Sequence, residues 1–274
     1  MSNDHATDAR FSQRLAAGRH YWQSPRGQRQ WRAERSGLAE VIARCGGQQA
    51  LELGFAPTLL SQSPIRHCMR WAEAIDSAEQ AATLVCRPDA LPLADESLDL
   101  TLVHHLLEIA PDPKSLLREA ARVTNDSGRL LVIGWHPLGI SGPRRLFRRP
   151  CGFHHSGEWI SVHRMRDWLG FVDFEIERLG YSGYLPFDNT PEWLAMEKWG
   201  QRYNLPLGRA WMISARRRGC RMIPLRRRFN PGAILGARQA GLAAVGRWPA
   251  LDERAAGAAR VASVRFSAND EPAP

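Results

Sequence analysis

The sequence predicts an α/β protein with a mostly parallel sheet, and one βαβ unit carries most of this prediction. Ser97–Val103 is a short run rich in Leu and Val, which is typical of a buried parallel strand. Asp112 and Pro113 then open a helix that keeps apolar side chains on one face as far as Val123. Arg129–Trp135 is a second apolar strand. Such a unit is right-handed, so ligands are expected beyond the carboxyl ends of its strands.

Further strands and helices are predicted on both sides of this unit. A helix over Gln28–Arg44 and strands over Ala50–Leu53, Met69–Ala74 and Thr83–Cys86 precede it. After it come a helix over Ser161–Leu169, a strand over Phe171–Leu179, a helix over Pro191–Tyr203 and a strand over Arg209–Arg216. In the link between the first two strands, about 15 residues long, Pro64 limits any helix to about two turns, and the next link, Ser77–Ala82, is shorter than the dozen or more residues of a usual parallel crossover. We therefore expect this half of the sheet to be trimmed.

The net charge of +9 is confined to the end of the chain. Residues 1–208 carry equal numbers of basic and acidic side chains, and the arginine-rich segment 209–274 supplies the whole excess. We predict a partly ordered arm over residues 1–27, one domain over 28–218, and a basic, largely disordered tail over 219–274. The tail could make weak contacts with polyanions, although a solubilising role is the alternative.

The cysteines indicate a reducing compartment. The chain has five, an odd number, and they are widely spaced without paired Cys or Cys/His motifs. No signal peptide and no transmembrane run is visible, so we expect a cytoplasmic protein.

Several motifs around the βαβ unit occur together in a known family. They are Asp89-Ala-Leu-Pro-Leu, Ser97-Leu-Asp-Leu, His104-His105, Asp112-Pro113, Leu116-Leu-Arg-Glu and Gly128-Arg-Leu. In this order they resemble the central motifs of class I S-adenosylmethionine (SAM)-dependent methyltransferases, in the subgroup that acts on small molecules and lipids. The resemblance is best over residues 89–137 and extends over 28–217. It implies a Rossmann-like, mostly parallel seven-stranded sheet with helices on both faces and a final antiparallel strand.

The resemblance implies SAM as cofactor and a set of residues that bind it. Glu52 would orient the glycine loop, in which the family's Gly-x-Gly-x-Gly positions are Gly54, Ala56 and Thr58. Glycine suits these positions because the backbone must come close to the cofactor. Two of the three are replaced, which leaves open a methyltransferase-like protein that has lost catalysis.

Two aspartates are candidates for binding the nucleoside. Asp76, at the end of the second predicted strand, would accept the ribose hydroxyls, or alternatively cap a helix. Asp89, followed by Ala90, would contact adenine according to the resemblance, or alternatively form a turn. Glu52 has a structural alternative too, as an ion-pair partner.

His104, His105 and Glu108 are the catalytic candidates. They follow the fourth strand at the predicted mouth of the site, where His104 could also border the cofactor. Any of them could act as a general base, or simply bond to the loop backbone. Methyl transfer depends mainly on positioning, so the fold needs no fixed catalytic residue.

Four histidines and a cysteine after the βαβ unit are possible metal ligands: His136, His154, His155, His163 and Cys151. No two of them have the spacing of paired Cys/His ligands, so we predict no metal site. The loop from His136 to Glu158 should cover the carboxyl end of the sheet. Its arginines, at positions 144, 145, 148 and 149, favour an acidic or phosphorylated acceptor, unless the loop is merely solvated.

Overall fold

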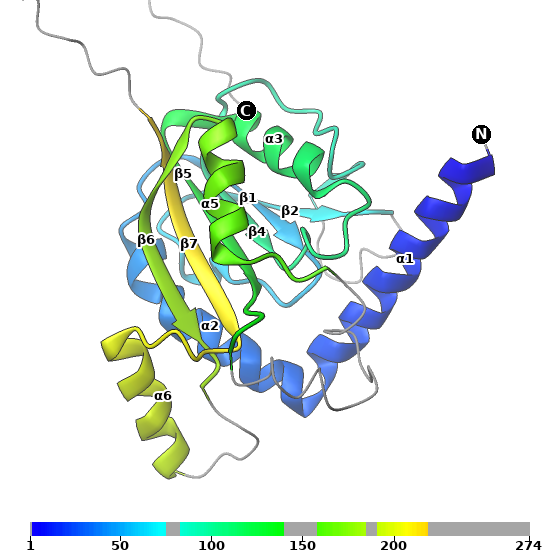
Figure 1. Ribbon diagram of the computed structural model, residues 1–274. Helices are drawn as coiled ribbons and strands as arrows, with labels where there is room; N and C mark the ends of the chain where they lie inside the picture. Colours follow the sequence, from blue (N-terminus) through cyan, green and yellow to red (C-terminus); the bar gives the residue numbers. More distant parts are fainter. Residues whose placement is uncertain (1, 75–82, 140–157, 185–190, 219–274) are drawn as a thin grey trace, which may run out of the picture. The chain divides into compact units, whose positions relative to one another are not determined.

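The structure, a computed structural model, describes residues 2–74, 83–139, 158–184 and 191–218 (Figure 1). Asp76, the arginines of the 136–158 loop, His154, His155, Cys151 and the basic tail therefore lie outside the described residues. Helices are α1 (Ser2–Gln23), α2 (Pro25–Ala43), the 3-10 helix η1 (Leu60–Gln62), α3 (Pro113–Val123), α5 (Val162–Phe171) and α6 (Pro191–Tyr203). None of the helices in these ranges is long and apolar enough to cross a membrane.

Seven strands form one sheet, as the sequence predicted. They are β1 (Gln49–Gly54), β2 (His67–Ala72), β3 (Leu84–Val85), β4 (Leu98–His104), β5 (Thr124–Trp135), β6 (Phe174–Ser182) and β7 (Ala210–Arg217). Their order is β3-β2-β1-β4-β5-β7-β6. The pairs among β1 to β5 are parallel, and the final strand, β7, lies antiparallel between β5 and β6.

Apolar side chains on both faces of the sheet are covered by helices (Figure 1). Leu51 and Leu53 of β1 pack in one cluster with residues of α3 and α5. Ala50, which points to the opposite face, packs in a second cluster with Leu38 and Ile42 of α2. This burial on both faces explains why the parallel strands read as continuous apolar runs.

The N-terminal segment is helical rather than the partly ordered arm that we expected. Helix α1 runs to Gln23, and Ser24 caps α2 by accepting a hydrogen bond from Gly27 N at 3.2 Å. A Cβ at Gly27 would stand 2.1 Å from the Tyr21 carbonyl oxygen, so the elbow between α1 and α2 requires glycine there. Phe11 and Trp22 are buried, which ties α1 into the fold.

The trimmed half of the sheet also appears in the structure. Between β1 and β2 the only described helix is η1, and β3 pairs with β2 over two residues. Several predicted boundaries are wrong. Strand β5 begins at Thr124 rather than Arg129, and β6 ends at Ser182 rather than Leu179. Strand β2 ends at Ala72 rather than Ala74, and β6 begins at Phe174 rather than Phe171, because α5 continues to Phe171 and Asp173 turns with φ of 59°.

Candidate functional site

The carboxyl ends of β1, β4 and β5 meet at one edge of the sheet, where the sequence placed the mouth of the site. Gly54 pairs with His104, and His104 pairs with Ile133, two residues before the end of β5. A Cβ at Gly54 would stand 3.0 Å from the Cβ of His104. A side chain at position 54 would therefore be crowded by β4 even without a ligand.

Glu52 holds the loop after β1, in keeping with its predicted orienting role. Its carboxylate accepts hydrogen bonds from the Thr58 hydroxyl at 2.6 Å and from Leu59 N at 3.0 Å. Thr58 also accepts a hydrogen bond from Leu60 N at 3.2 Å. The side chain at the third family glycine position thus fixes the loop, which glycine could not do.

The middle of the loop is fixed by neighbouring elements. The Ala56 carbonyl accepts a hydrogen bond from Arg70 of β2 at 3.0 Å, and the Pro57 carbonyl accepts one from Trp31 Nε1 of α2 at 2.8 Å. Ala56 itself is buried in a cluster with Trp22 and Trp135. We name Trp22, Ala56 and Trp135 the aromatic plug.

The aromatic plug lies at the mouth. The Trp22 ring stacks on the Trp135 ring, with centroids 6.0 Å apart and planes 11° from parallel. It also contacts the rings of His104 and His105, at 5.2 and 5.4 Å between centroids. Trp22 thereby covers the ends of β4 and β5 and packs against Ala56 of the loop after β1, where the cofactor was expected.

A buried polar cluster lies directly beneath Trp22. Glu34 of α2 faces His104 Nε2 at 2.8 Å with one carboxylate oxygen and His105 Nε2 at 3.1 Å with the other. Glu108 Oε1 accepts a hydrogen bond from Trp135 N at 2.6 Å, and its Oε2 lies 3.6 Å from His105 Nδ1. The side chains of Glu34, His104 and His105 have no exposed surface.

The cluster separates charge between its members. Burial alone would raise the pKa of Glu34, but His105 and His104 lower it to about 2. Burial would lower the pKa of His105, yet the carboxylates of Glu34 and Glu108 raise it to about 9. A charged Glu34 and a protonated His105 therefore form a buried ion pair in the protein alone.

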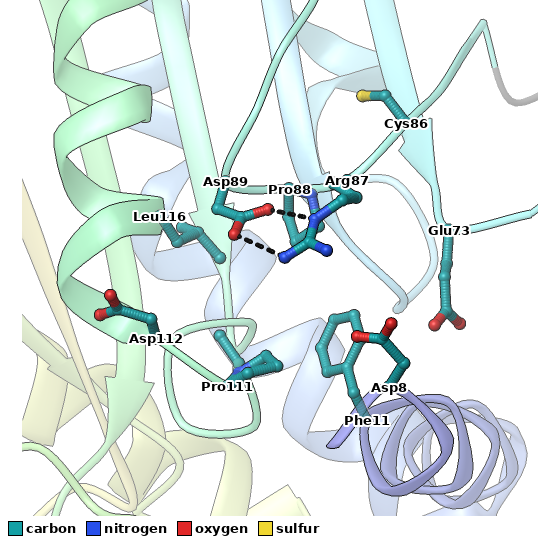
Figure 2. Close-up of a pocket in the computed structure, with 11 residues that line it drawn as sticks. Asp8, Phe11, Glu73, Cys86, Arg87, Pro88, Asp89, Pro111, Asp112 and Leu116 are labelled. Atoms are coloured by element: carbon teal, nitrogen blue, oxygen red, sulfur yellow. Dashed lines mark hydrogen bonds and ion pairs between the residues drawn. The ribbon is translucent and has the colours of Figure 1, made fainter. Parts of the chain in front are cut away.

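A cavity of about 220 Å³ opens at the trimmed half of the sheet (Figure 2). Glu73, the first residue after β2, and Asp89, which follows β3, both line it, together with Phe11 of α1. Asp89 makes two hydrogen bonds to Arg87, of 3.1 and 3.0 Å, and these lower the pKa of Asp89. Ala90 is exposed. Sequence reasoning missed Glu73, because it placed the end of β2 two residues too late.

A second cavity, of about 300 Å³, is bounded by α1 and the loop after β4. Arg10 and Arg14 of α1 line it, as do Glu108 and Glu158. Of the three catalytic candidates, Glu108 is the one that lines this space, although its carboxylate is buried and directed towards Trp135 N and His105. His136 lies apart from the cluster, with its Nδ1 3.2 Å from the Gly208 carbonyl oxygen, and His163 is exposed.

Comparison with known proteins agrees with the sheet topology. A family model described as a methyltransferase domain matches residues 45–132. The uncharacterized protein YafS of Escherichia coli K12 is 35% identical over 104 residues, which cover 37% of this chain and 42% of YafS. The ubiquinone biosynthesis O-methyltransferase of Xanthomonas oryzae pv. oryzae PXO99A is 24% identical over 159 residues, 56% of this chain and 64% of that enzyme. The chain thus spans less than two thirds of either relative.

Two solved structures share the fold. A SAM-dependent methyltransferase of Thermotoga maritima, described as a possible histamine N-methyltransferase, aligns with a TM-score of 0.55 and 18% identity. That alignment covers 73% of this chain and 93% of the other. A complex of the Haloferax volcanii Trm112 methyltransferase activator with a putative methyltransferase gives a TM-score of 0.53 at 18% identity, over 74% of this chain and 93% of that chain.

Proposed function

We propose that this chain, which belongs to the class I SAM-dependent methyltransferase family, transfers the methyl group of SAM to a small-molecule or lipid-like acceptor. One observation carries the proposal. Glu73 and Asp89, each following a strand of the trimmed half-sheet, line a single cavity. Carboxylates at the carboxyl ends of parallel strands are suited to accept hydrogen bonds from a nucleoside.

The adenosine end of SAM fits the residues present better than the methionine end does. Glu73 and Asp89 offer carboxylates to the ribose and the adenine amino group, provided that Asp89 gives up a bond to Arg87. The cavity of about 220 Å³ is smaller than the roughly 300–1,000 Å³ of usual ligand pockets. Trp22 packs against Ala56 of the glycine loop and against the His104 ring. Binding of the whole cofactor therefore requires Trp22 to move.

The second cavity is suited to the acceptor. SAM, when bound, supplies an electrophilic methyl group. Glu108 lines the cavity, but its carboxylate is buried, with Oε1 accepting a hydrogen bond from Trp135 N, so it could take a proton from an acceptor hydroxyl or amine only after turning towards the cavity. Arg10 and Arg14 on the same cavity favour an acceptor that carries an acidic group.

A second candidate function is ligand binding without methyl transfer. Trp22 packs against Ala56, where the family has glycine, and Glu34 bonds to both histidines at the mouth. Each contact stabilises the arrangement in which Trp22 occupies the expected cofactor site. The third reading, action through the arginine-rich segment 219–274 on nucleic acid or anionic surfaces, concerns residues outside the described ranges and stays a prediction.

Calorimetric titration with SAM and its demethylated product tests the proposal. Glu73→Gln and Asp89→Asn should each weaken binding by roughly 1–3 kcal/mol, the value of a hydrogen bond to a charged group. Glu175→Gln, at an exposed position of β6, is the matched control and should bind like the parent. Equal affinities in all variants would remove Glu73 and Asp89 from the site. No heat at millimolar SAM would favour the non-catalytic candidate.

A further inference from the structure

The polar cluster beneath Trp22 has a composition that suits a metal ion. Glu34, His104 and His105 each offer one ligand atom, and these atoms all lie within 4.8 Å of one another. They come from two distant parts of the chain, α2 and the carboxyl end of β4. We propose that Glu34, His104 and His105 bind one divalent transition-metal ion of the zinc class. This inference does not depend on the proposed methyltransferase function.

The donor set and its spacing fit zinc. Two imidazole nitrogens and one carboxylate oxygen are a known three-ligand set for Zn²⁺, with a fourth position left for water. Metal–ligand distances of about 2.0–2.2 Å place tetrahedral ligands roughly 3.3–3.5 Å apart. The Glu34 oxygens stand 2.8 and 3.1 Å from the Nε2 atoms of His104 and His105. Each of these contacts is to a different carboxylate oxygen and is shorter than the tetrahedral separation, so the imidazoles must move away from Glu34 by about half an ångström to admit the ion.

The backbone brings adjacent histidines to the same ligand. Consecutive residues of an extended strand point to opposite faces. His105, however, has φ of 51°, the left-handed conformation that non-glycine residues rarely adopt. This turn directs the His105 ring back towards Glu34, beside His104. Unfavourable backbone conformations of this kind tend to persist at functional sites.

Other side chains support the three ligands from behind. Metal-bound histidines usually donate their second ring N–H to a carboxylate or carbonyl group. Glu108 Oε2 lies 3.6 Å from His105 Nδ1, and both atoms are buried without a hydrogen-bond partner in the structure. A small movement of Glu108 Oε2 towards His105 Nδ1 would complete this hydrogen bond. Gln30 Nε2 donates to Glu34 Oε1 at 2.8 Å and orients the carboxylate.

Aromatic rings shield the cluster from water. The His105 ring stacks on Trp135 with centroids 4.1 Å apart, and Trp22 contacts both imidazoles from the side of the mouth. A bound ion would thus link α2 to β4 at a site that these rings shield from water. The buried ion pair of Glu34 and His105, without a metal, is the competing explanation for the same geometry.

Metal analysis of the untagged full-length protein separates the two explanations. We expect about one equivalent of zinc or a similar metal after purification, and a lower melting temperature after chelator treatment that returns when Zn²⁺ is added. Replacing Zn²⁺ by Co²⁺ should give visible absorption typical of a tetrahedral site with nitrogen ligands. These measurements need no variant. Metal-free protein whose melting temperature ignores both chelator and Zn²⁺ would overturn the proposal.

Variants then locate the ion. Glu34→Gln keeps the shape of the side chain, and His105→Asn removes one imidazole; each should abolish stoichiometric binding. Glu108→Gln should weaken Zn²⁺ binding by roughly 10–100-fold, as loss of an outer partner does. His136→Asn is the matched control, because it removes a buried imidazole outside the cluster and should keep the metal. Zinc binding that survives Glu34→Gln would place the metal elsewhere.

Discussion

Trp22→Ala should destabilise the protein strongly, because Trp22 joins α1 to the carboxyl end of the sheet. The side chain is 1% exposed and packs against Trp135 and both histidines of the cluster. Truncating a buried Trp to Ala costs about 3–5 kcal/mol. Trp22 Nε1 is buried without a hydrogen-bond partner, so its removal also relieves an unsatisfied donor. We therefore expect a loss of about 3 kcal/mol, the lower end of that range.

Urea unfolding followed by circular dichroism measures this loss. In a domain of this size, about 3 kcal/mol corresponds to a fall in melting temperature of roughly 6–12 °C. Trp199→Ala is the matched control, because Trp199 is 55% exposed on α6 and its loss should change stability by less than about 0.5 kcal/mol. Equal stability of the Trp22 and Trp199 variants would show that α1 does not pack on the sheet as described.

The same variant tests whether Trp22 blocks the cofactor. If SAM binds only when Trp22 has moved, part of the binding free energy is used to displace Trp22. The apparent affinity of the wild type for SAM is then lowered in proportion to the small fraction of molecules that are open. Removing an opening cost of about 3 kcal/mol would raise the affinity of Trp22→Ala for SAM by up to roughly 100-fold. An unchanged or weaker affinity, in a variant that remains folded at the titration temperature, would contradict this role.

Three further predictions concern other parts of the chain. Asp99→Asn should cost roughly 1–3 kcal/mol, because the carboxylate accepts hydrogen bonds from two backbone N–H groups at the start of β1, those of Gln48 and Gln49, and from Asn125. These bonds outweigh burial and lower the pKa of Asp99. Its contribution to the free energy of unfolding, measured by urea titration, should therefore be full above the unfolded pKa of about 3.9 and should vanish as the pH falls through the folded pKa. Glu52→Gln should cost a similar roughly 1–3 kcal/mol by loosening Thr58, and a stable variant would refute its anchoring role. A chain ending at Arg218 should melt like the full chain and lose salt-dependent heparin binding, whereas a sharply lower melting temperature would show that the tail stabilises the domain.

The sheet could be predicted because its signals are local. Ser97–Val103 and Arg129–Trp135 are apolar runs bounded by turn residues, and both became central strands. Helix α1 was not predicted from the sequence, because its buried residues belong to two different hydrophobic clusters. Phe11 packs in the main core while Trp22 belongs to the aromatic plug. The apolar stripe of α1 is therefore short and broken, and only tertiary packing makes it visible.

The site was predictable only in part, for a related reason. Glu52 could be assigned to the loop through the family resemblance, and its partners in the structure, Thr58 and Leu59, lie within seven residues of it. Glu34 is far from His104 in sequence and reads as one charge among the arginines of α2. A signal did exist, since Glu34 lies four residues before Leu38 and eight before Ile42, on the apolar stripe of the helix. A charge on a buried stripe needs a partner, and the sequence alone does not say which.

Because α1 and α2 meet at Ser24, either helix could move to open the site, and the two movements differ in free energy. Moving α2 would pull Glu34 away from His104 and His105, and breaking a buried ion pair costs about 3–5 kcal/mol because a charge is left without a partner. Trp22 belongs to α1, on the other side of Ser24. A swing of α1 about Ser24 would uncover Ala56, His104 and the cavity beside Asp89 while α2 keeps its contacts with the cluster. That swing loses mainly the apolar packing of Trp22, Leu15 and Phe11. Because SAM and an acceptor could replace part of this packing with contacts of their own, α1 is the element whose movement ligand binding can best compensate.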